Sequence, residues 1–372
     1  MRKSLFLAAV MLSMLAPQVA IAGGERLETS GRAVALGGAF VGLGNSAYAI
    51  FYNPAGLSRL ALREVSGFYA RPFGLSELSY FNFAYADPLL LPESFGTMGV
   101  AAQRYGFDLY NETKFSLAYA NSFEQKFFYG VTVSYNTLAI ATYGTDAAFG
   151  IDAGVMALLS PQLAVGFAAT NLNRPVMSTA AEPLAQTYTL GASYRMLTNV
   201  MLVADLEKDV RYPLSVKAGA EYEPVASLAL RLGFATEPSK LTGGIGLRYA
   251  GIEFDYAFYS HPDLGLTHQA SVSLAFGGAS IVDAATKREE EDRRITDAFD
   301  ELKPRLAPGE KINLNTAELD DLLRLGISKT IANRILGYRK EYKRFSLPSE
   351  LLRVRGVTKE FFKSIEAYLI TE

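Results

Sequence analysis

Residues 267–276 read THQASVSLAF, and this stretch decides the fold. Every second residue from Ala270 to Phe276 is apolar, and the residues between them are small or polar. This period of two is typical of a β-strand that lies between an apolar and a polar environment. The preceding sequence repeats the pattern, whereas the sequence after residue 278 is charged and has a helical period near 3.6. We therefore interpret residues 267–276 as the last strand of a membrane barrel.

The start of the chain has the features of an export signal. Arg2 and Lys3 are basic, an apolar run follows, and residues 20–22 read AIA, the small-x-small pattern that signal peptidase cleaves. We expect residues 1–22 to be a signal peptide. No later apolar run reaches the roughly 18 residues that a membrane helix needs, which argues against an inner-membrane helical protein. The chain has no Cys, so the exported fold must be stabilised by packing or by lipid.

Residues 63–278 predict an all-β transmembrane barrel of about 14 antiparallel strands. Turn signals separate segments whose length suits the about 9 to 11 residues with which a tilted strand crosses a bilayer. Tyr and Phe collect near the strand ends, as expected for aromatic girdles at the two membrane interfaces. The expected strands start near Glu64, Glu77, Gly96, Glu112, Lys126, Asp146, Gln162, Ala185, Asn199, Pro213, Ser227, Leu241, Gly251 and Thr267.

An even strand number places both ends of the barrel in the periplasm, with short turns there and longer loops, such as residues 171–184, outside. The alternative fold is a soluble β-sandwich or propeller. A sandwich would have to pair its apolar faces with one another, and here apolar faces recur on nearly every strand. The polar face of residues 252–259 carries Glu253 and Asp255. We expect these two carboxylates to lie in the lumen and to tune its electrostatics.

Residues 23–62 precede the first strand and predict an N-terminal hatch. Small residues dominate residues 31–44, which lets backbone pack closely inside a lumen. A short helix is then broken, because Pro removes a hydrogen-bond donor and Gly permits a positive φ. Two interpretations remain open, a fixed plug and a movable hatch. The residues of this hatch motif are Asn53, Pro54, Ala55 and Gly56.

The Gly-rich run at residues 31–44, followed by YNPAGL at residues 52–57, resembles the hatch of the FadL-like family of long-chain fatty acid transporters. It is equally similar to the PorV-like proteins of type IX secretion. Both resemblances imply a fourteen-stranded outer-membrane barrel. The FadL-like resemblance implies passage of hydrophobic small molecules past the hatch. The PorV-like resemblance implies capture and shuttling of secreted proteins instead.

The last quarter of the chain has a different character. By count, 18 of the 36 Lys and Arg residues lie after residue 281. Residues 279–308 are rich in charges at helical spacing and predict a charged helical linker that ends at prolines. Residues 309–372 predict a small all-α domain of two helix-hairpin-helix units in tandem. Asn315 is the expected N-cap of its first helix, with Glu318 three residues on as in a capping box.

This domain resembles the helix-hairpin-helix domain of the ComEA-like competence DNA receptors, through the entry NLNTA at residues 313–317, the pair Tyr338-Arg339, and Phe345. The resemblance implies a duplex DNA contact, in which hairpin backbone N–H groups at a helix N-terminus meet a phosphate. The second hairpin Gly of that family is replaced here by Ser328 and by Thr358, which weakens the expected contact. The candidate DNA-binding hairpins are Gly326, Ile327, Ser328 and Lys329, and Gly356, Val357, Thr358 and Lys359.

Residues 309–372 hold 12 basic and 9 acidic residues by count, a surplus of 3. The candidate basic patch consists of Arg339, Lys340, Lys343 and Arg344. The same cluster is compatible with an ordinary solvated helix end, where cations are favourable. Two roles therefore remain open for this domain: non-specific binding of duplex DNA, and binding of a periplasmic protein.

The sequence predicts no enzyme, no metal site and no cofactor. His261 and His268 are the only histidines, and neither has a Cys or a suitably spaced carboxylate as a partner. We expect a protein of the outer membrane of a Gram-negative bacterium, embedded in lipid, with its C-terminal domain in the periplasm. The leading function is a FadL/PorV-like channel for hydrophobic compounds or a secretion-associated protein. The alternatives are a DNA-uptake component and a scaffold whose tail binds a periplasmic protein.

Overall fold

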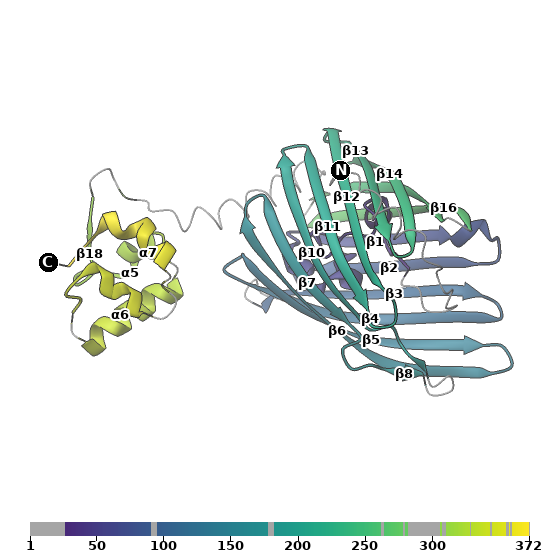
Figure 1. The fold of residues 1–372 in the computed structure, drawn as a ribbon, viewed down its shortest axis with the longest axis horizontal. Coiled ribbons are helices and arrows are strands. Elements are labelled where there is room, and N and C mark those ends of the chain that lie inside the picture. The colour runs from purple at the N-terminus through teal and green to yellow at the C-terminus, as the bar shows by residue number, and fades with distance from the viewer. Residues whose placement is uncertain are drawn as a thin grey trace, which may run out of the picture.

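The computed structural model describes residues 27–90, 95–177, 182–261, 264–277, 280–281, 306, 310–327, 329–342, 344–354, 357 and 359–371. The expected signal peptide, residues 1–22, and nearly all of the expected helical linker lie outside the described residues. Figure 1 shows two units, a large barrel of strands and a small helical unit that carries the C-terminus.

Fourteen long strands close into an antiparallel barrel, because each pairs with the next along the chain and β1 pairs with β16. The predicted strand number is therefore confirmed, and no observed start differs from the predicted one by more than two residues. The strands are β1 (Arg63–Arg71), β2 (Ser79–Asp87), β3 (Thr97–Phe107), β4 (Tyr110–Phe123), β5 (Phe127–Ile140), β6 (Gly144–Ser160), β7 (Leu163–Thr170), β10 (Thr187–Leu197), β11 (Val200–Asp209), β12 (Leu214–Val225), β13 (Leu228–Thr236), β14 (Ser239–Tyr249), β15 (Ile252–His261) and β16 (Gly265–Gly277).

Both ends of the barrel wall, the start of β1 and the end of β16, lie at one end of the barrel, which we call the terminal end. The prediction of longer loops at the opposite end is wrong for most of the connections there. Residues 171–186, of which 178–181 lie outside the described residues, form the longest connection at that end, with the short strands β8 (Val176–Met177) and β9 (Glu182–Pro183). Elsewhere the chain turns within two or three residues after β3, β5 and β13, and the strands themselves are longer, reaching 17 residues in β6. The last short strand, β17 (Ser280–Ile281), pairs with the end of β16.

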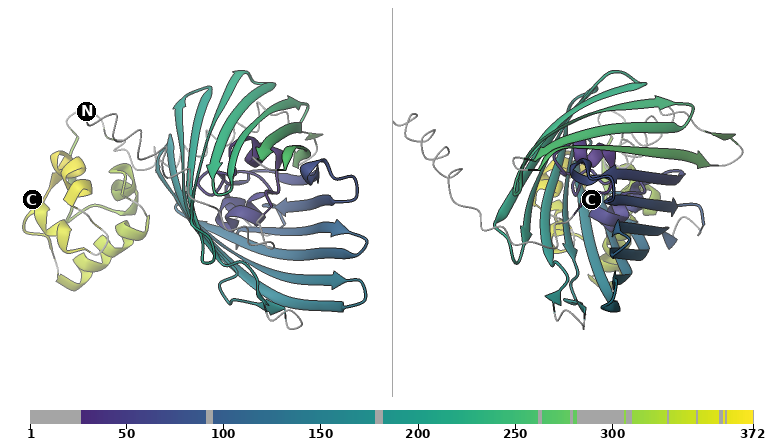
Figure 2. Two further views of the ribbon diagram at one scale, coloured as in Figure 1. Left: turned by 45° about the vertical axis from the view of Figure 1, so that its right-hand side comes forward. Right: turned by 90° about the vertical axis from the view of Figure 1, so that its right-hand side faces the viewer.

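The two faces of the wall differ as the alternation predicts. Side chains that point outward are apolar and exposed, such as Phe115 (54%) and Ile252 (45%), whereas Asp255 on the inner face is 3% exposed. The exposed apolar face suits a hydrocarbon solvent. The lumen is filled by the described part of the hatch, residues 27–62, drawn in purple inside the ring of strands in Figure 2.

The hatch contains three short helical segments, α2 (Gly31–Ala35), α3 (Ala49–Tyr52) and η1 (Pro54–Arg59). Ser30 caps α2, because its side chain accepts a hydrogen bond from the Ala33 N–H. Asn53 ends α3 in an extended conformation and accepts a hydrogen bond from the Ala55 N–H, so the predicted helix break lies where the sequence places it. A further single turn, η2 (Pro72–Gly74), lies between β1 and β2.

The C-terminal unit has its own apolar core, with Leu314, Leu322, Ile335, Phe345 and Leu351 fully buried. Its helical segments are α5 (Leu319–Arg324), α6 (Lys329–Tyr342), η4 (Pro348–Arg353), α7 (Lys359–Ile365) and η5 (Glu366–Tyr368), and β18 (Ile312–Asn313) pairs in parallel with β19 (Leu369–Ile370). In the described part of the chain, no helix has the length and apolar character needed to cross a membrane.

The predicted cap of the first tail helix is wrong. The N-cap of α5 is Glu318, which forms a capping box with Asp321. Asn315 instead accepts a hydrogen bond from the Phe345 N–H and donates to the carbonyls of Phe345 and Thr371. It therefore joins the entry of the unit to the end of the chain, a long-range role that local spacing does not indicate.

Candidate functional site

The hatch lies directly against a belt of glycines on the inner face of the wall. Three pairs face each other across neighbouring strands: Gly130 with Gly154, Gly166 with Gly191, and Gly219 with Gly233. A Cβ atom at Gly166 would lie 2.4 Å from the Val41 carbonyl oxygen, and one at Gly219 would lie 2.7 Å from the Leu36 Cα. Wall and hatch backbones thus meet without side chains between them.

The predicted hatch motif lies at this contact. The Asn53 amide Nδ2 donates to the Val41 carbonyl within the hatch (3.0 Å) and to the Val155 carbonyl of β6 (3.2 Å). Pro54 and Ala55 lie against Gly130 of β5. A side chain at Gly56 would collide with Gly44, because its Cβ would lie 2.0 Å from the Gly44 carbonyl oxygen. The motif therefore joins the two halves of the hatch and holds them against the wall.

Polar side chains of the wall bind the hatch backbone. Asp205 Oδ2 accepts hydrogen bonds from the N–H groups of Phe40 (2.9 Å) and Val41 (3.0 Å). Glu64 accepts one from the Ala47 N–H (2.9 Å). Because these amides have no partner within a regular helix, the wall carboxylates satisfy groups that burial would otherwise leave unpaired.

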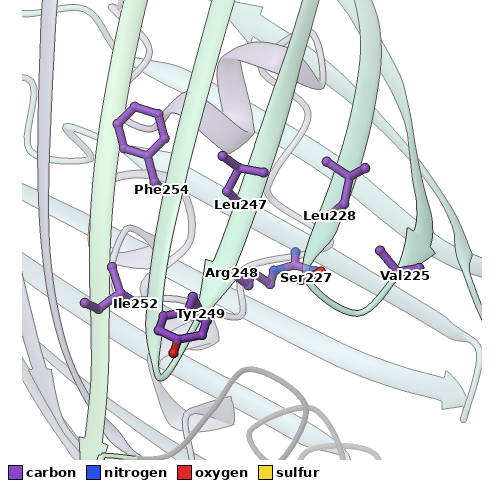
Figure 3. A pocket seen from close by; sticks show the side chains of 8 residues that line it. All are labelled: Val225, Ser227, Leu228, Leu247, Arg248, Tyr249, Ile252 and Phe254. Atoms are coloured by element: carbon purple, nitrogen blue, oxygen red, sulfur yellow. The ribbon is translucent and has the colours of Figure 1, made fainter.

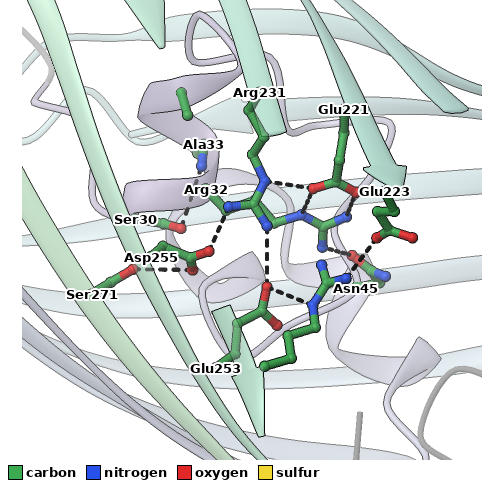
Figure 4. Close-up of polar contacts among 12 residues, drawn as sticks. Ser30, Arg32, Ala33, Asn45, Glu221, Glu223, Arg231, Glu253, Asp255 and Ser271 are labelled. Carbon is green, nitrogen blue, oxygen red and sulfur yellow. Dashed lines mark hydrogen bonds and ion pairs between the residues drawn. The ribbon is translucent and has the colours of Figure 1, made fainter. Parts of the chain in front are cut away.

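A buried network of ions joins the hatch to β12, β13, β14 and β15 (Figure 4). Arg32 of α2 forms two hydrogen bonds with Glu221, at 2.7 and 2.8 Å. Glu221 also binds Arg231 (2.6 Å), a guanidinium with no exposed surface that reaches Glu253 (3.2 Å) and Asp255. Arg32 is therefore tied to the wall through a carboxylate that it shares with a wall cation.

Arg248 extends the network by binding Glu223 (2.7 Å) and Glu253 (3.1 Å). Burial by itself lowers the pKa of the Arg32 guanidinium, but the attraction of Glu221 outweighs this effect and raises the pKa above its ordinary value. Arg32 therefore stays charged, and its positive charge is matched by wall carboxylates.

Glu253 and Asp255 do lie on the inner face, as the sequence predicts, and each is bound to an arginine. Sequence reasoning missed Arg32, Glu221 and Arg231. The available signal was that charged residues on neighbouring strands occupy the alternate positions that point into the lumen. The register between the strands is needed to predict which of these residues form ion pairs.

Aromatic rings gather in the lumen on the side away from the terminal end. Phe68 packs edge-on to Tyr80, with ring centres 5.5 Å apart, and Tyr80 packs in the same way on Tyr105 at 6.1 Å. Tyr259 belongs to the same apolar cluster, which includes Phe40 of the hatch. These rings come from β1, β2, β3 and β15, so one side of the lumen is aromatic.

The hatch contributes its own aromatic pair to this cluster. Phe40 and Tyr52 lie with ring centres 5.0 Å apart. The hydroxyl of Tyr52 accepts a hydrogen bond from the Thr29 N–H (2.8 Å), and burial raises the pKa of Tyr52 well above its ordinary value. The hatch therefore presents an apolar surface and a neutral phenol to the aromatic side of the lumen.

A hollow of about 620 Å³ lies on the outer wall at the terminal end, beside the β12–β13 and β14–β15 turns (Figure 3). Its lining is largely apolar and includes Leu247, Ile252 and Phe254, which are about half exposed, and Tyr249, which is 84% exposed. These side chains face away from the lumen. The hollow therefore belongs to the lipid-facing surface and not to a path through the barrel.

The first hairpin of the C-terminal unit has the expected shape. Gly326 has a positive φ of 77°, which glycine adopts without strain, and Ile327 is anchored in the core with 1% exposure. Helix α6 then begins at Lys329. Ser328, Gly356 and Thr358 lie outside the described residues, and Val357 is half-buried.

The predicted basic patch is divided by the structure. The Arg339 guanidinium donates to the carbonyls of Ala317 (2.7 Å) and Leu314 (3.3 Å), so it holds the entry of the domain to α6. Lys340 and Arg344 are exposed, and Lys343 lies outside the described residues. Two cations of the proposed patch are therefore available to solvent in the part of the tail that the structure describes.

The family described as "Helix-hairpin-helix motif" matches residues 308–370. Comparison with curated proteins gives no significant match. Solved barrels superimpose on the rest of the chain. CymD, described as a monoaromatic hydrocarbon channel, matches with a TM-score of 0.51 and 11% identity, covering 69% of this chain and 100% of that one. This chain has the FadL barrel fold.

A FadL homologue of Pseudomonas aeruginosa gives a TM-score of 0.52 at 11% identity over the same shares of the two chains. The toluene transporter TodX of P. putida gives 0.50 at 12% identity, covering 68% of this chain and 100% of that one. The resemblances to the FadL-like barrel and to a helix-hairpin-helix domain are thereby confirmed at the level of fold. Among the described residues, no three His, Asp or Glu side chains are grouped so that they could hold a metal ion.

Proposed function

We propose that this protein is a non-enzymatic outer-membrane channel for small hydrophobic molecules, gated by its hatch. The observation that carries the proposal is the aromatic side of the lumen, formed by Phe68, Tyr80, Tyr105 and Tyr259 above the hatch. A path for hydrated solutes would be lined by polar groups, whereas aromatic rings offer favourable contact to an apolar solute. The solved neighbours are described as a toluene transporter and a monoaromatic hydrocarbon channel, which supports this solute class.

The charged side of the lumen has a complementary role in this proposal. Arg32, Arg231 and their carboxylates occupy the lumen toward the terminal end on the side of β12 to β15, where a hydrophobic solute would meet charged groups. A solute bound among the rings therefore has to displace part of the hatch or leave sideways. We place the terminal end and the helix-hairpin-helix tail in the periplasm, and the aromatic side of the lumen toward the outside.

Binding to the lumen can be tested with a single reporter, because the chain contains no Trp. In a Tyr105→Trp variant, bromobenzene should quench the fluorescence in a saturable manner, and toluene should compete. In Tyr249→Trp, whose ring lies on the outer wall with 84% exposure, quenching should only rise linearly as bromobenzene enters the detergent micelle. Linear quenching in both variants, without competition by toluene, would contradict the proposal.

We propose as a second function that the tail binds duplex DNA without sequence preference. The family match over residues 308–370 and the positive φ of Gly326 ahead of α6 support this role. The exposed cation Lys340 lies in the last turn of α6, and the exposed Arg344 follows its end. Each phosphate contact should add about 0.9 to the slope of log affinity against log salt concentration.

The test is a salt titration of duplex binding by the full chain. The double variant Lys340→Gln/Arg344→Gln should bind more weakly and lower the salt slope by up to about 2, for two lost phosphate contacts. Arg324→Gln is the matched control, because this exposed cation is already paired with Glu310 at 2.6 Å. An unchanged slope in the double variant, or no binding at low salt, would leave a protein partner as the role of the tail.

A further inference from the structure

Formal charges on the outer wall of the barrel follow a pattern that the channel function does not require. Among the outward positions of the fourteen strands, all of them described, Arg63 and Asp87 lie at the terminal end and bind each other at 3.0 Å. The other outward formal charges, Arg71, Arg104 and Lys208, lie toward the opposite end. All three are cations, so the outward strand positions near this rim carry one sign of charge, and the nearest carboxylates, Glu77 and Asp108, lie in the exposed turns beyond the strand ends.

Two of these cations lie close together, on β1 and β3, with β2 between them. Tyr69 of β1 pairs in register with Phe81 of β2, and Phe81 pairs with Arg104 of β3. Arg71 lies two residues beyond Tyr69 on the same face. With strands about 4.8 Å apart, the two arginine backbones are separated laterally by about 10 Å, a span that two extended guanidinium groups can bridge around one anion.

The surroundings of Arg71 favour an anionic ligand. Its Nε donates to the Tyr69 hydroxyl at 2.9 Å, which holds the side chain along the wall. His268 is its register partner on β16, and the Tyr256 hydroxyl is hydrogen-bonded to His268 Nδ1. The outward neighbours on β15 and β16 thus add further hydrogen-bonding groups.

Apolar surface continues from the cations toward the middle of the wall. Tyr69, Phe81 and Phe83 are exposed by 46%, 45% and 46% on the outer face of β1 and β2. A ligand that fits this surface has an anionic head at the rim and apolar chains below it. A second copy of the barrel is disfavoured as an occupant, because it would bring the same cations.

We propose that Arg71 and Arg104 bind the phosphate groups of the phosphorylated glycolipid of the outer leaflet. The inference rests on the proposed orientation, in which the rim opposite the terminal end faces outward. Arginine suits this ligand because its planar guanidinium pairs with phosphate through two parallel hydrogen bonds. The bound lipid would fix the depth of the wall beside the aromatic side of the lumen.

Native mass spectrometry of the purified full chain, titrated with bis-phosphorylated lipid A, tests the proposal. Arg71→Gln/Arg104→Gln should lose at least tenfold in affinity. Lys208→Gln is the matched control, an outward cation of the same rim on the far side of the barrel, and it should change the affinity by less than twofold. Dephosphorylated lipid A should bind the wild type as weakly as the double variant binds lipid A.

Equal affinity of the double variant and the wild type for lipid A would overturn the proposal, as would undiminished binding of dephosphorylated lipid A. Preference of the wild type for phosphatidylglycerol over lipid A would also overturn it, since that result would place the rim against the inner leaflet. The Tyr105→Trp quenching assay in the same double variant reports separately on the channel, so failure of lipid binding and failure of solute binding are distinguishable.

Discussion

Replacement of Gly166 by Ala should loosen the hatch without disturbing the strand that carries it. The new Cβ would lie 2.4 Å from the Val41 carbonyl oxygen, and ordinary contact begins at 3.4 Å, so the hatch would have to retreat by 3.4 − 2.4 = 1.0 Å. That movement would stretch the 3.2 Å hydrogen bond from Asn53 of the hatch to the Val155 carbonyl of β6. Overpacking costs about 1–3 kcal/mol. A lost hydrogen bond adds about 1 kcal/mol.

The sum, about 2–4 kcal/mol, destabilises the state in which the hatch lies against the wall, which we call the seated state. It does not affect the strand pairing. Since each 1.4 kcal/mol is a factor of ten, the population of unseated hatch should rise by about 30- to 700-fold. The amides of Phe40 and Val41 report on this equilibrium, because both donate to Asp205 when the hatch is seated. Hydrogen exchange of a peptide covering residues 39–44 should accelerate by the same factor.

Gly67→Ala is the control, since a Cβ there would meet its nearest atom, the Asn82 carbonyl oxygen, only at 4.0 Å. This variant should leave hatch exchange unchanged. If Gly166→Ala and Gly67→Ala exchange at the same rate in residues 39–44, the contact between hatch and wall does not restrain the hatch, and the reasoning is refuted.

Three further substitutions test the ion network and the tail. Arg32→Met should destabilise the folded barrel by about 3 kcal/mol in urea-induced unfolding, because Glu221 stays buried with one cation fewer. Adding Glu221→Gln should recover part of this loss. If the free-energy changes of the two substitutions simply add, the ion pair does not stabilise the fold. Asn315→Ala removes three hydrogen bonds and should lower the unfolding free energy of the tail by about 2–3 kcal/mol, whereas the exposed Asn333→Ala should change it by under about 0.5 kcal/mol. Arg339→Gln should cost the tail about 1–2 kcal/mol and leave the salt slope of DNA binding unchanged; a reduced slope would show that this guanidinium contacts phosphate.

The strands could be predicted from the sequence because their signal is local. Alternation within residues 252–259 is enough to assign Ile252 and Phe254 to the outer face and Asp255 to the inner face, and each strand repeats the same argument independently. The helix break at Asn53 was predictable for the same reason, since the limits that Pro54 sets on the local backbone do not depend on distant residues. The positive φ expected at Gly56 is not observed, because Gly56 lies within η1.

The contacts of Arg32 could not be predicted, because they depend on register between segments far apart in the sequence. Arg32 and Glu221 are 189 residues apart, and they meet only after β12 has been placed in the wall. The same holds for Asn315 and Thr371 in the tail, 56 residues apart, where local spacing suggested a helix cap instead. Local patterns assign residues to elements, whereas partners of buried polar groups follow from the packing of those elements.

The glycine belt lies between these two cases. Gly154 and Gly166 carry no local signal that separates them from glycines of ordinary turns. Once the strands are paired, Gly130 faces Gly154 and Gly166 faces Gly191, and two facing glycines on the inner side of a wall leave a gap that only backbone can fill. A sequence reading that first pairs consecutive strands and then searches the inward positions for facing glycines would therefore locate the seat of the hatch, although it could not identify the ions that hold it.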